Sequence, residues 1–104
     1  MMAVTPQEMA IVLAIVQKHV PHCDVLAFGS RVKGTHRTAS DLDLAVKGRE
    51  KIPFSIISHM KEDFMESDIP YKVDVLDYYG VSEAFRAIID AGNQQIYNGS
   101  MQGR

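Results

Sequence analysis

The chain has little cysteine and almost no excess of charge of either sign. Its single cysteine, Cys23, cannot form an internal disulfide, which is typical of proteins from reducing compartments. No partner base lies near Cys23 in the sequence, so we expect a packed small side chain and not a nucleophile. The formal net charge of −2 provides no basic field for nucleic acid, and we expect no direct nucleic-acid binding. Any affinity for phosphate must therefore be local.

Long apolar runs are also missing. No run approaches the roughly 20 residues that a helix needs to cross a bilayer, and the N-terminus lacks the basic start and the small-residue cleavage site of a signal peptide. These features predict a cytoplasmic protein that does not contact membranes. A length of 104 residues predicts one domain over residues 1–104, large enough for a single hydrophobic core but too small for a second substrate domain.

Helix and strand signals alternate along the chain. Thr5, Pro6 and Glu8 form a helix start with a capping box, and Pro21 ends this first helix. A continuous apolar segment, Val25 to Gly29, is typical of a strand buried on both faces. Further along, the pattern predicts a strand over Leu42–Val46, a helix from Pro53 to about Ser67, a strand over Tyr71–Leu76 and a helix over Val81–Ala91.

The predicted fold class is α/β (α+β), a small mixed β-sheet of about three strands packed with helices in the order α-β-α-β-α-β-α. Ile96-Tyr97 is expected to add only a short extended piece after the last helix. The polar, glycine-bearing residues 98–104 predict a flexible, frayed tail. His36, in the loop before the second strand, and His59, on the second long helix, are each expected to face water.

Two aspartates stand two residues apart at the second strand. Because side chains on a strand alternate between faces, Asp41 and Asp43 point the same way, while Leu42, Leu44 and Val46 point the other way. Neighbouring like charges repel each other, so such a pair indicates a compensating group, usually a divalent cation. Mg²⁺ prefers oxygen ligands and is typically held by one or two carboxylates together with substrate phosphates. Asp41 and Asp43 are therefore candidate metal ligands.

A Gly-Ser corner precedes these acids. Gly29 allows the backbone to approach a ligand closely, and a turn that leads into a helix start points free N–H groups at an anion. The Ser30 hydroxyl adds a further donor for a phosphate oxygen. Arg31, Lys33 and Arg37 place positive charge in the same loop. We therefore predict that the corner binds the phosphates of a nucleotide.

The spacing of these motifs resembles a known family. Gly29-Ser30, ten intervening residues and Asp41-Leu42-Asp43 match the signature of the DNA polymerase β-like nucleotidyltransferase superfamily. The fuller form, Gly-Ser-Arg-x-x-Gly followed by Ser-Asp-x-Asp-Leu, resembles its smallest branch, the minimal nucleotidyltransferase (MNT) domain proteins. These are commonly the antitoxins of HEPN/MNT toxin–antitoxin pairs. The resemblance covers most of the chain, from the first helix to the last.

The resemblance implies a function. An MNT antitoxin transfers AMP from ATP to a tyrosine of a HEPN-type ribonuclease toxin, with Mg²⁺, commonly two ions, at the site. It also implies a third carboxylate on a later strand, a role that we assign to Asp74. Asp74 interrupts an apolar strand, where an unpaired charge is costly. Asp77, on the opposite face of that strand and nearer its end, is the competing candidate.

Other interpretations predict different properties. A Gly-Ser pair is often only a turn, and Asp-x-Asp is often a solvated strand face. A non-catalytic antitoxin or nucleotide-binding module would neutralise its partner by masking it, but would not need so many clustered acids. Nucleotide transfer to a small molecule such as an antibiotic is a third possibility, which the lack of a second domain disfavours. An EF-hand calcium loop does not fit, because Ala45 and Val46 stand at positions that require a polar ligand and a glycine. The sequence leaves the oligomeric state open, whether homo- or hetero-oligomeric.

Overall fold

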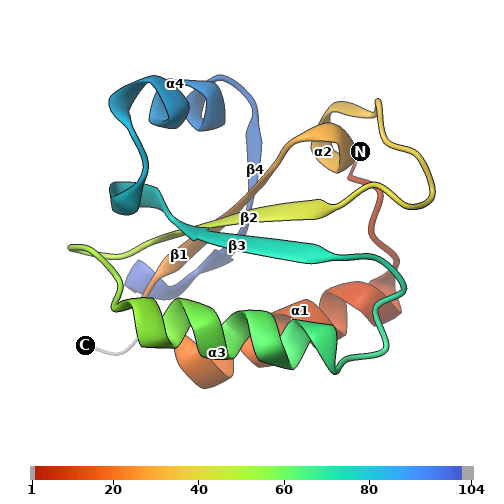
Figure 1. The fold of residues 1–104 in the computed structure, drawn as a ribbon, viewed down its shortest axis with the longest axis horizontal. Helices are drawn as coiled ribbons and strands as arrows, with labels where there is room; N and C mark the ends of the chain where they lie inside the picture. Colours follow the sequence, from red (N-terminus) through yellow and green to blue (C-terminus); the bar gives the residue numbers. More distant parts are fainter. Residues whose placement is uncertain (1, 102–104) are drawn as a thin grey trace.

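One four-stranded mixed sheet organises the molecule (Figure 1). The structure is a computed structural model, and it describes residues 2–101. The strands stand in the order β3-β2-β1-β4, with β1 antiparallel to both β2 and β4 and with β2 parallel to β3. Their bounds are Asp24–Phe28 for β1, Leu42–Lys47 for β2, Val73–Asp77 for β3 and Asn93–Asn98 for β4.

Helices lie on both faces of this sheet. Figure 1 shows α1 and α3 together below the sheet and α2 and α4 above it, at its two ends. The predicted fold class is confirmed, and so is the predicted element order up to α4, with boundaries shifted by at most two residues. The bounds are Pro6–His19 for α1, Ser30–Lys33 for α2, Phe54–Met65 for α3 and Glu83–Ala91 for α4, with short 3₁₀ helices at Tyr78–Gly80 (η1) and Gly99–Met101 (η2). Among residues 2–101, no helix has both the length and the apolar character needed to span a bilayer.

The predicted capping box at the start of α1 is present. The Glu8 N–H donates to the Thr5 hydroxyl oxygen at 3.1 Å, and the Thr5 N–H donates to the Glu8 carboxylate at 3.0 Å. Both bonds satisfy amide groups that a helix start leaves without an acceptor. At the other end of α1, Lys18 and His19 contact Asp63 of α3 at 3.0 and 2.6 Å, which ties the two helices together below the sheet.

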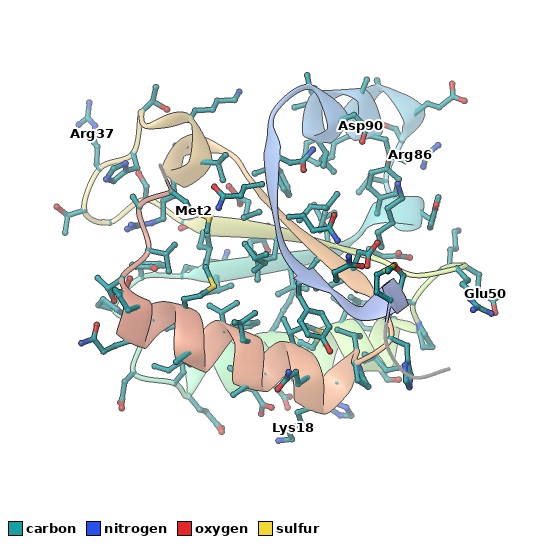
Figure 2. All side chains as sticks on the ribbon, turned by 180° about the vertical axis from the view of Figure 1, so that it is seen from behind. Met2, Lys18, Arg37, Glu50, Arg86 and Asp90 are labelled. Atoms are coloured by element: carbon teal, nitrogen blue, oxygen red, sulfur yellow. The ribbon has the colours of Figure 1, made fainter. Side chains whose placement is uncertain are left out.

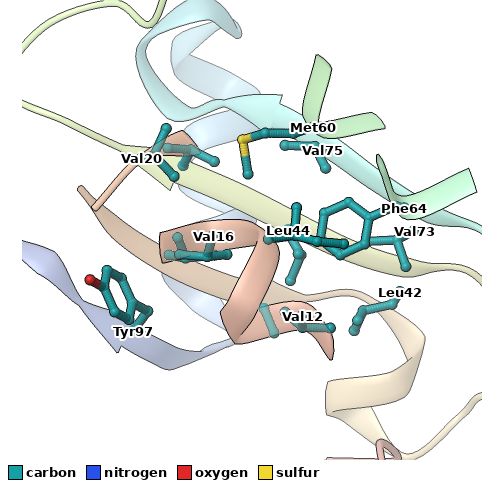
Figure 3. Close-up of a cluster of buried hydrophobic side chains, with 14 of the residues drawn as sticks. Val12, Val16, Val20, Leu42, Leu44, Met60, Phe64, Val73, Val75 and Tyr97 are labelled. Carbon is teal, nitrogen blue, oxygen red and sulfur yellow. The ribbon is translucent and has the colours of Figure 1, made fainter. Parts of the chain in front are cut away.

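The larger hydrophobic core lies between the sheet and the α1/α3 layer (Figure 3). Leu42, Leu44 and Val46 are almost completely buried there, as the alternation along the sequence predicts. Their neighbours across the layer come from the apolar stripes of α1 and α3. The labelled members of this core are Val12, Val16, Val20, Leu42, Leu44, Met60, Phe64, Val73, Val75 and Tyr97.

A smaller core covers only part of the opposite face. Ile89 of α4 and Tyr78 of η1 pack on Leu26, Phe28 and Ala45 of the central strands. β1 is therefore buried on both faces, as its continuous apolar run predicts. The apolar cover ends at Ala45 on β2, and the next position on the same face is an aspartate. The polar site thus begins where this second core stops.

The expectation of about three strands and of a frayed tail from residue 98 needs correction. The expected short piece at Ile96-Tyr97 is part of a full strand, β4, that pairs with β1, and residues 99–101 form η2. Tertiary contacts decide this, because the Tyr97 ring is buried and its hydroxyl donates to the Pro21 carbonyl at 2.9 Å. The Ser100 N–H donates to Asp24 at 3.1 Å. Residues 102–104 of the predicted tail lie outside the described residues.

Replacing Tyr97 by phenylalanine tests how β4 is held. The ring still fits the core, but the Pro21 carbonyl loses its donor, so we expect the free energy of unfolding to fall by about 1 kcal/mol in urea. Tyr79→Phe is the control, because Tyr79 is 38% exposed and outside both cores, and it should change stability little. Equal losses in both variants would contradict the role given to the Tyr97 hydroxyl.

Candidate active site

The register of β2 and β3 places two carboxylates side by side. Asp43 pairs directly with Asp74 on the neighbouring parallel strand, so both side chains project from the same face of the sheet. Asp77, the competing candidate, pairs with Val46 and points to the other face. Its carboxylate accepts the N–H groups of Ile52 at 3.1 Å and Tyr79 at 3.2 Å. Asp77 therefore has a structural role in the turns that follow β2 and β3, and Asp74 is the neighbour of Asp43.

The first of the predicted acids stands apart from this pair. Asp41 lies one residue before β2 begins and is exposed. Within residues 2–101, no three acidic, histidine or cysteine side chains form a ready-made metal site. The expected convergence of three carboxylates is thus observed for Asp43 and Asp74, with Asp41 at the rim. Asp41 stands in the loop before β2, whereas Asp43 and Asp74 lie within paired strands, so Asp41 is the most exposed of the three.

The environment of Asp43 favours its protonated form. Partial burial, followed by the nearby charges of Asp74 and Asp41, raises the pKa of Asp43 to about 6, while the positive charge of Lys72 opposes the shift. Burial and like charges both disfavour the ionised carboxylate. Such a perturbed acid is typical of functional sites. A positive charge beside Asp43 would favour the ionised form of this carboxylate.

The Gly-Ser corner lies directly against Asp43. Gly29 adopts φ 85° and ψ −162°, a conformation essentially restricted to glycine. A Cβ atom at this position would overlap the Asp43 carboxylate oxygen Oδ2. Ser30 is the first residue of α2, and the first N–H groups of a helix have no acceptor within it. The predicted corner therefore brings hydroxyl and amide donors to the edge of the acidic pair.

The structure assigns Arg31 a different place from the predicted one. Its side chain is 5% exposed, and its guanidinium donates at 2.8 Å to each of the carbonyl oxygens of Ala3, Thr38 and Ser40. It also lies 3.6 Å from the centre of the Tyr71 ring. The expected contact of Arg31 with phosphate is therefore not supported, because these carbonyl groups occupy the guanidinium. The sequence shows the charge of an arginine but not its partners.

Other basic residues of the loop remain exposed. Lys33 ends α2, and its Cε atom lies 3.8 Å from the position of a Cβ built on Gly92, so its stem reaches toward the start of β4. Arg37 extends outward from the tip of the loop in Figure 2. His36 is exposed, as is His59 on α3, as predicted. Among the basic residues predicted to bind phosphate, Lys33 is thus exposed and close to the start of β4.

Two lysines near the acids were not predicted. Lys61 of α3 lies 3.8 Å from Asp74, and the charge of Lys72 lowers the pKa of Asp43. Lys72 stands two residues before Asp74, so the two-residue period of the strand places it on the same side and was available as a signal. Lys61 comes from a helix in another layer, and no local pattern indicates it.

A concave surface that the acids do not line lies elsewhere on the molecule. A groove of about 560 Å³ runs beside the end of β2, and its lining includes Cys23, Lys47 and Glu50. Figure 2 shows Glu50 at the opposite end of the molecule from Arg37. Cys23 packs against the core there, and burial raises the pKa of its thiol, as suits a packed side chain. Neither Asp43 nor Asp74 lines this groove.

Comparison with known proteins decides the family. The family model described as Polymerase beta, Nucleotidyltransferase matches residues 12–102. The chain belongs to the polymerase β nucleotidyltransferase family. A relative named probable protein adenylyltransferase MntA, from Haemophilus influenzae, is 51% identical over 83 residues, which cover 80% of this chain and 73% of the relative. As a nucleotidyltransferase, the protein uses a nucleotide as substrate.

Solved structures with the same fold include toxin–antitoxin complexes. A toxin–antitoxin structure with AMP-PNP matches with a TM-score of 0.74 and 19% identity, over 86% of this chain and 72% of the other. The structure of a tri-AMPylated Shewanella oneidensis HEPN toxin in complex with an MNT antitoxin matches with a TM-score of 0.65 and 16% identity, over 86% and 68% of the two chains. At these identities the likeness concerns the fold.

Substituting Gly29 tests the close approach of the corner to Asp43. We expect Gly29→Ala to lower the free energy of unfolding of this nucleotidyltransferase by about 2 to 4 kcal/mol, because backbone strain adds to the overlap with the carboxylate. Gly34→Ala is the matched control. Gly34 has φ 83° with nothing within 4 Å of an added Cβ, so only strain of about 1 kcal/mol should appear. Equal losses in urea unfolding would refute the contact.

The raised pKa of Asp43 predicts a pH-dependent stability. Between about pH 4 and the folded-state pKa of about 6, the folded nucleotidyltransferase binds more protons than the unfolded chain, so stability falls as pH rises through this window. Asp43→Asn should remove this decline and raise the free energy of unfolding above pH 6 by about 1 to 2 kcal/mol, less than two full pKa units imply because the side chain keeps some solvent access.

Urea unfolding at several pH values, in a chelator, checks this expectation. Asp68→Asn is the control, since Asp68 is exposed in the turn before β3 and loses the same charge. The idea fails if the curves of Asp43→Asn and the wild type stay parallel from pH 4 to pH 8.

Proposed function

We propose that this nucleotidyltransferase is an antitoxin that transfers AMP from ATP to a tyrosine of a cognate HEPN-type toxin. The observation that carries the proposal is the in-register pair of Asp43 and Asp74 beside the Gly29-Ser30 corner. Further support comes from the relative at 51% identity, whose name is that of a protein adenylyltransferase. The ATP requirement suits a cytoplasmic protein.

The donor chemistry of the acids fits Mg²⁺. Asp43 and Asp74 offer oxygen ligands from neighbouring strands, and Asp41 supplies a third carboxylate from the rim. Burial, followed by repulsion from the neighbouring carboxylates, raises the pKa of Asp43, so a divalent cation would relieve a cost that the fold already carries. We propose that Asp41, Asp43 and Asp74 hold two ions. Bound there, Mg²⁺ would neutralise charge on the transferring phosphate and on the leaving group.

The corner would hold the departing end of ATP. We assign the hydroxyl of Ser30 and the free N–H groups at the start of α2 to the phosphate oxygens, with Gly29 allowing the backbone to come close. Lys33, exposed on the same short helix, adds a positive charge. Holding the nucleotide in line with its acceptor is the main requirement of nucleotidyl transfer.

The position of Asp74 suits an acceptor that arrives from outside. β3 is an edge strand, and the Asp74 side chain is 41% exposed. A tyrosine on another protein can therefore approach this carboxylate without a rearrangement of the sheet. In our proposal, Asp74 also accepts the proton of the tyrosine hydroxyl as the tyrosine oxygen attacks the α-phosphate of ATP, the bond from the α-phosphorus to the bridging oxygen breaks, and pyrophosphate leaves.

Intact-mass spectrometry of the partner tests this function. The protein is incubated with ATP, Mg²⁺ and the product of the adjacent open reading frame, whose mass should rise by whole AMP units. Asp43→Asn and Asp74→Asn should each slow transfer by at least about 100-fold, since a catalytic metal supplies several kcal/mol. Asp77→Asn is the matched control, because the amide oxygen can still accept the N–H groups of Ile52 and Tyr79.

The two readings of the protein give different results in this experiment. An unchanged partner mass together with retained neutralisation of the toxin would replace the transfer reaction by masking. Equal loss of transfer in Asp74→Asn and Asp77→Asn would remove the special role of Asp74.

A further inference from the structure

Arg31 joins three segments of the chain at the rim of the site. Its Nε donates to the carbonyl of Ser40, one terminal nitrogen to the carbonyl of Ala3 and the other to that of Thr38, each at 2.8 Å. The Ala3 N–H in turn donates to the Arg31 carbonyl at 3.0 Å. Figure 2 shows Met2 on this N-terminal segment, between the loop of Arg37 and α1. Arg31 thus fastens the loop that carries the first acid.

The two peptide groups that flank Asp41 are both held. Arg31 binds the carbonyl of Ser40, which belongs to the peptide before Asp41. The N–H of Leu42, which belongs to the peptide after it, donates to the carbonyl of Lys72 at 2.9 Å. With both peptides fixed, the position of the Asp41 backbone is set even though its side chain is exposed.

The hydrogen bond from Leu42 to Lys72 is also connected to Arg31. The guanidinium stacks on the ring of Tyr71, the residue before Lys72, at 3.6 Å from the ring centre. The Tyr71 hydroxyl donates to Glu8 of the α1 capping box at 2.8 Å. Burial, the hydrogen bond to Glu8 and the charge of Glu8 raise the pKa of Tyr71 far above its usual value, so the hydroxyl stays a donor. The contacts of Arg31 and Tyr71 therefore connect α1, the loop before β2 and the start of β3.

We propose that Arg31 is the positioning residue for Asp41. By holding the loop backbone, Arg31 keeps the Asp41 carboxylate at a constant distance from the Gly29-Ser30 corner. The inference rests on the proposed function. It replaces the phosphate contact expected from the sequence with an indirect role, because the guanidinium acts on the loop backbone and not on the nucleotide. Only the planar fork of arginine can donate to three carbonyl groups, one on the N-terminal segment and two on the loop, while stacking on a ring, so lysine is not equivalent here.

The Arg31→Lys variant distinguishes a positioning role from two alternatives, a direct phosphate ligand and a purely structural residue. We expect Mn²⁺, used alone as a probe, to bind about 10- to 100-fold more weakly in electron paramagnetic resonance titrations, as is typical when an orienting partner of a metal ligand is lost. The Mg²⁺ concentration for half-maximal AMP transfer should rise and kcat at fixed Mg²⁺ should fall, while KM for ATP stays within about threefold of the wild type.

The control is Arg86→Lys, which should match the wild type in all these measurements. Arg86 lies at the other end of the sheet face, on α4, and donates to the carbonyl of Val81 at 2.7 Å, so its substitution is the same exchange outside the site. Urea unfolding of both variants records any loss of stability separately from the loss of metal binding.

Each result decides the proposal. A higher KM for ATP with unchanged Mn²⁺ affinity would make Arg31 a phosphate ligand and overturn the inference. Unchanged Mn²⁺ affinity and kcat, with only lower stability, would reduce Arg31 to a structural residue. If the wild type transfers no AMP, the proposed function fails, and the Mn²⁺ titration still decides whether Arg31 positions Asp41.

A second variant covers the case in which Arg31→Lys does not fold. Tyr71→Leu removes the stacking partner and leaves the arginine in place, and we expect it to weaken Mn²⁺ binding in the same direction. Tyr71→Phe keeps the ring, loses the hydrogen bond to Glu8, and should bind Mn²⁺ more tightly than Tyr71→Leu. Wild-type Mn²⁺ affinity in Tyr71→Leu would refute the link between Arg31 and the acid.

Discussion

The site depends on how one face of β2 and β3 is buried. Leu42 and Leu44 on β2 pack with Val73 and Val75 on β3 in the larger core, and this packing fixes the register of the two strands. A slip by one residue would move these apolar side chains into water. The same register forces Asp43 and Asp74 next to each other on the opposite face. Apolar burial on one side thus holds together two charges that would otherwise separate.

Much of this arrangement could be predicted from the sequence, because its signals are local. The two-residue alternation from Leu42 to Val46 assigned the core and acidic faces correctly. The capping box at Thr5 and Glu8 fixed the start of α1 to the residue. The spacing from Gly29-Ser30 to the two aspartates indicated the family, which the comparisons confirm.

The remainder depends on contacts between distant segments, which a local pattern does not contain. β4 is a polar strand that forms because it pairs with β1 and because Tyr97 is buried. Tyr97 pairs with Val25, which lies 72 residues earlier in the chain. The role of Arg31 depends on which carbonyl groups surround it in the folded chain. The contact of Lys61 with Asp74 depends on the packing of a helix from another layer against the edge of the sheet. The exposed position of Asp41 follows from where β2 begins, because pairing with the segment before β3 starts at the N–H of Leu42.

The partial cover of the upper sheet face has a consequence for the strength of the site. Phe28 pairs in register with Asp43, and with Ile89, Tyr78 and Ala45 it forms an apolar region that ends at the acids. Beside such a region the effective dielectric constant is well below that of water, so Coulomb forces on that flank decay more slowly. A small domain can therefore generate a strong local field without enclosing its ligand. An open surface, accessible to another macromolecule, can therefore stabilise charge by Coulomb forces of the kind usually found in a deep cleft.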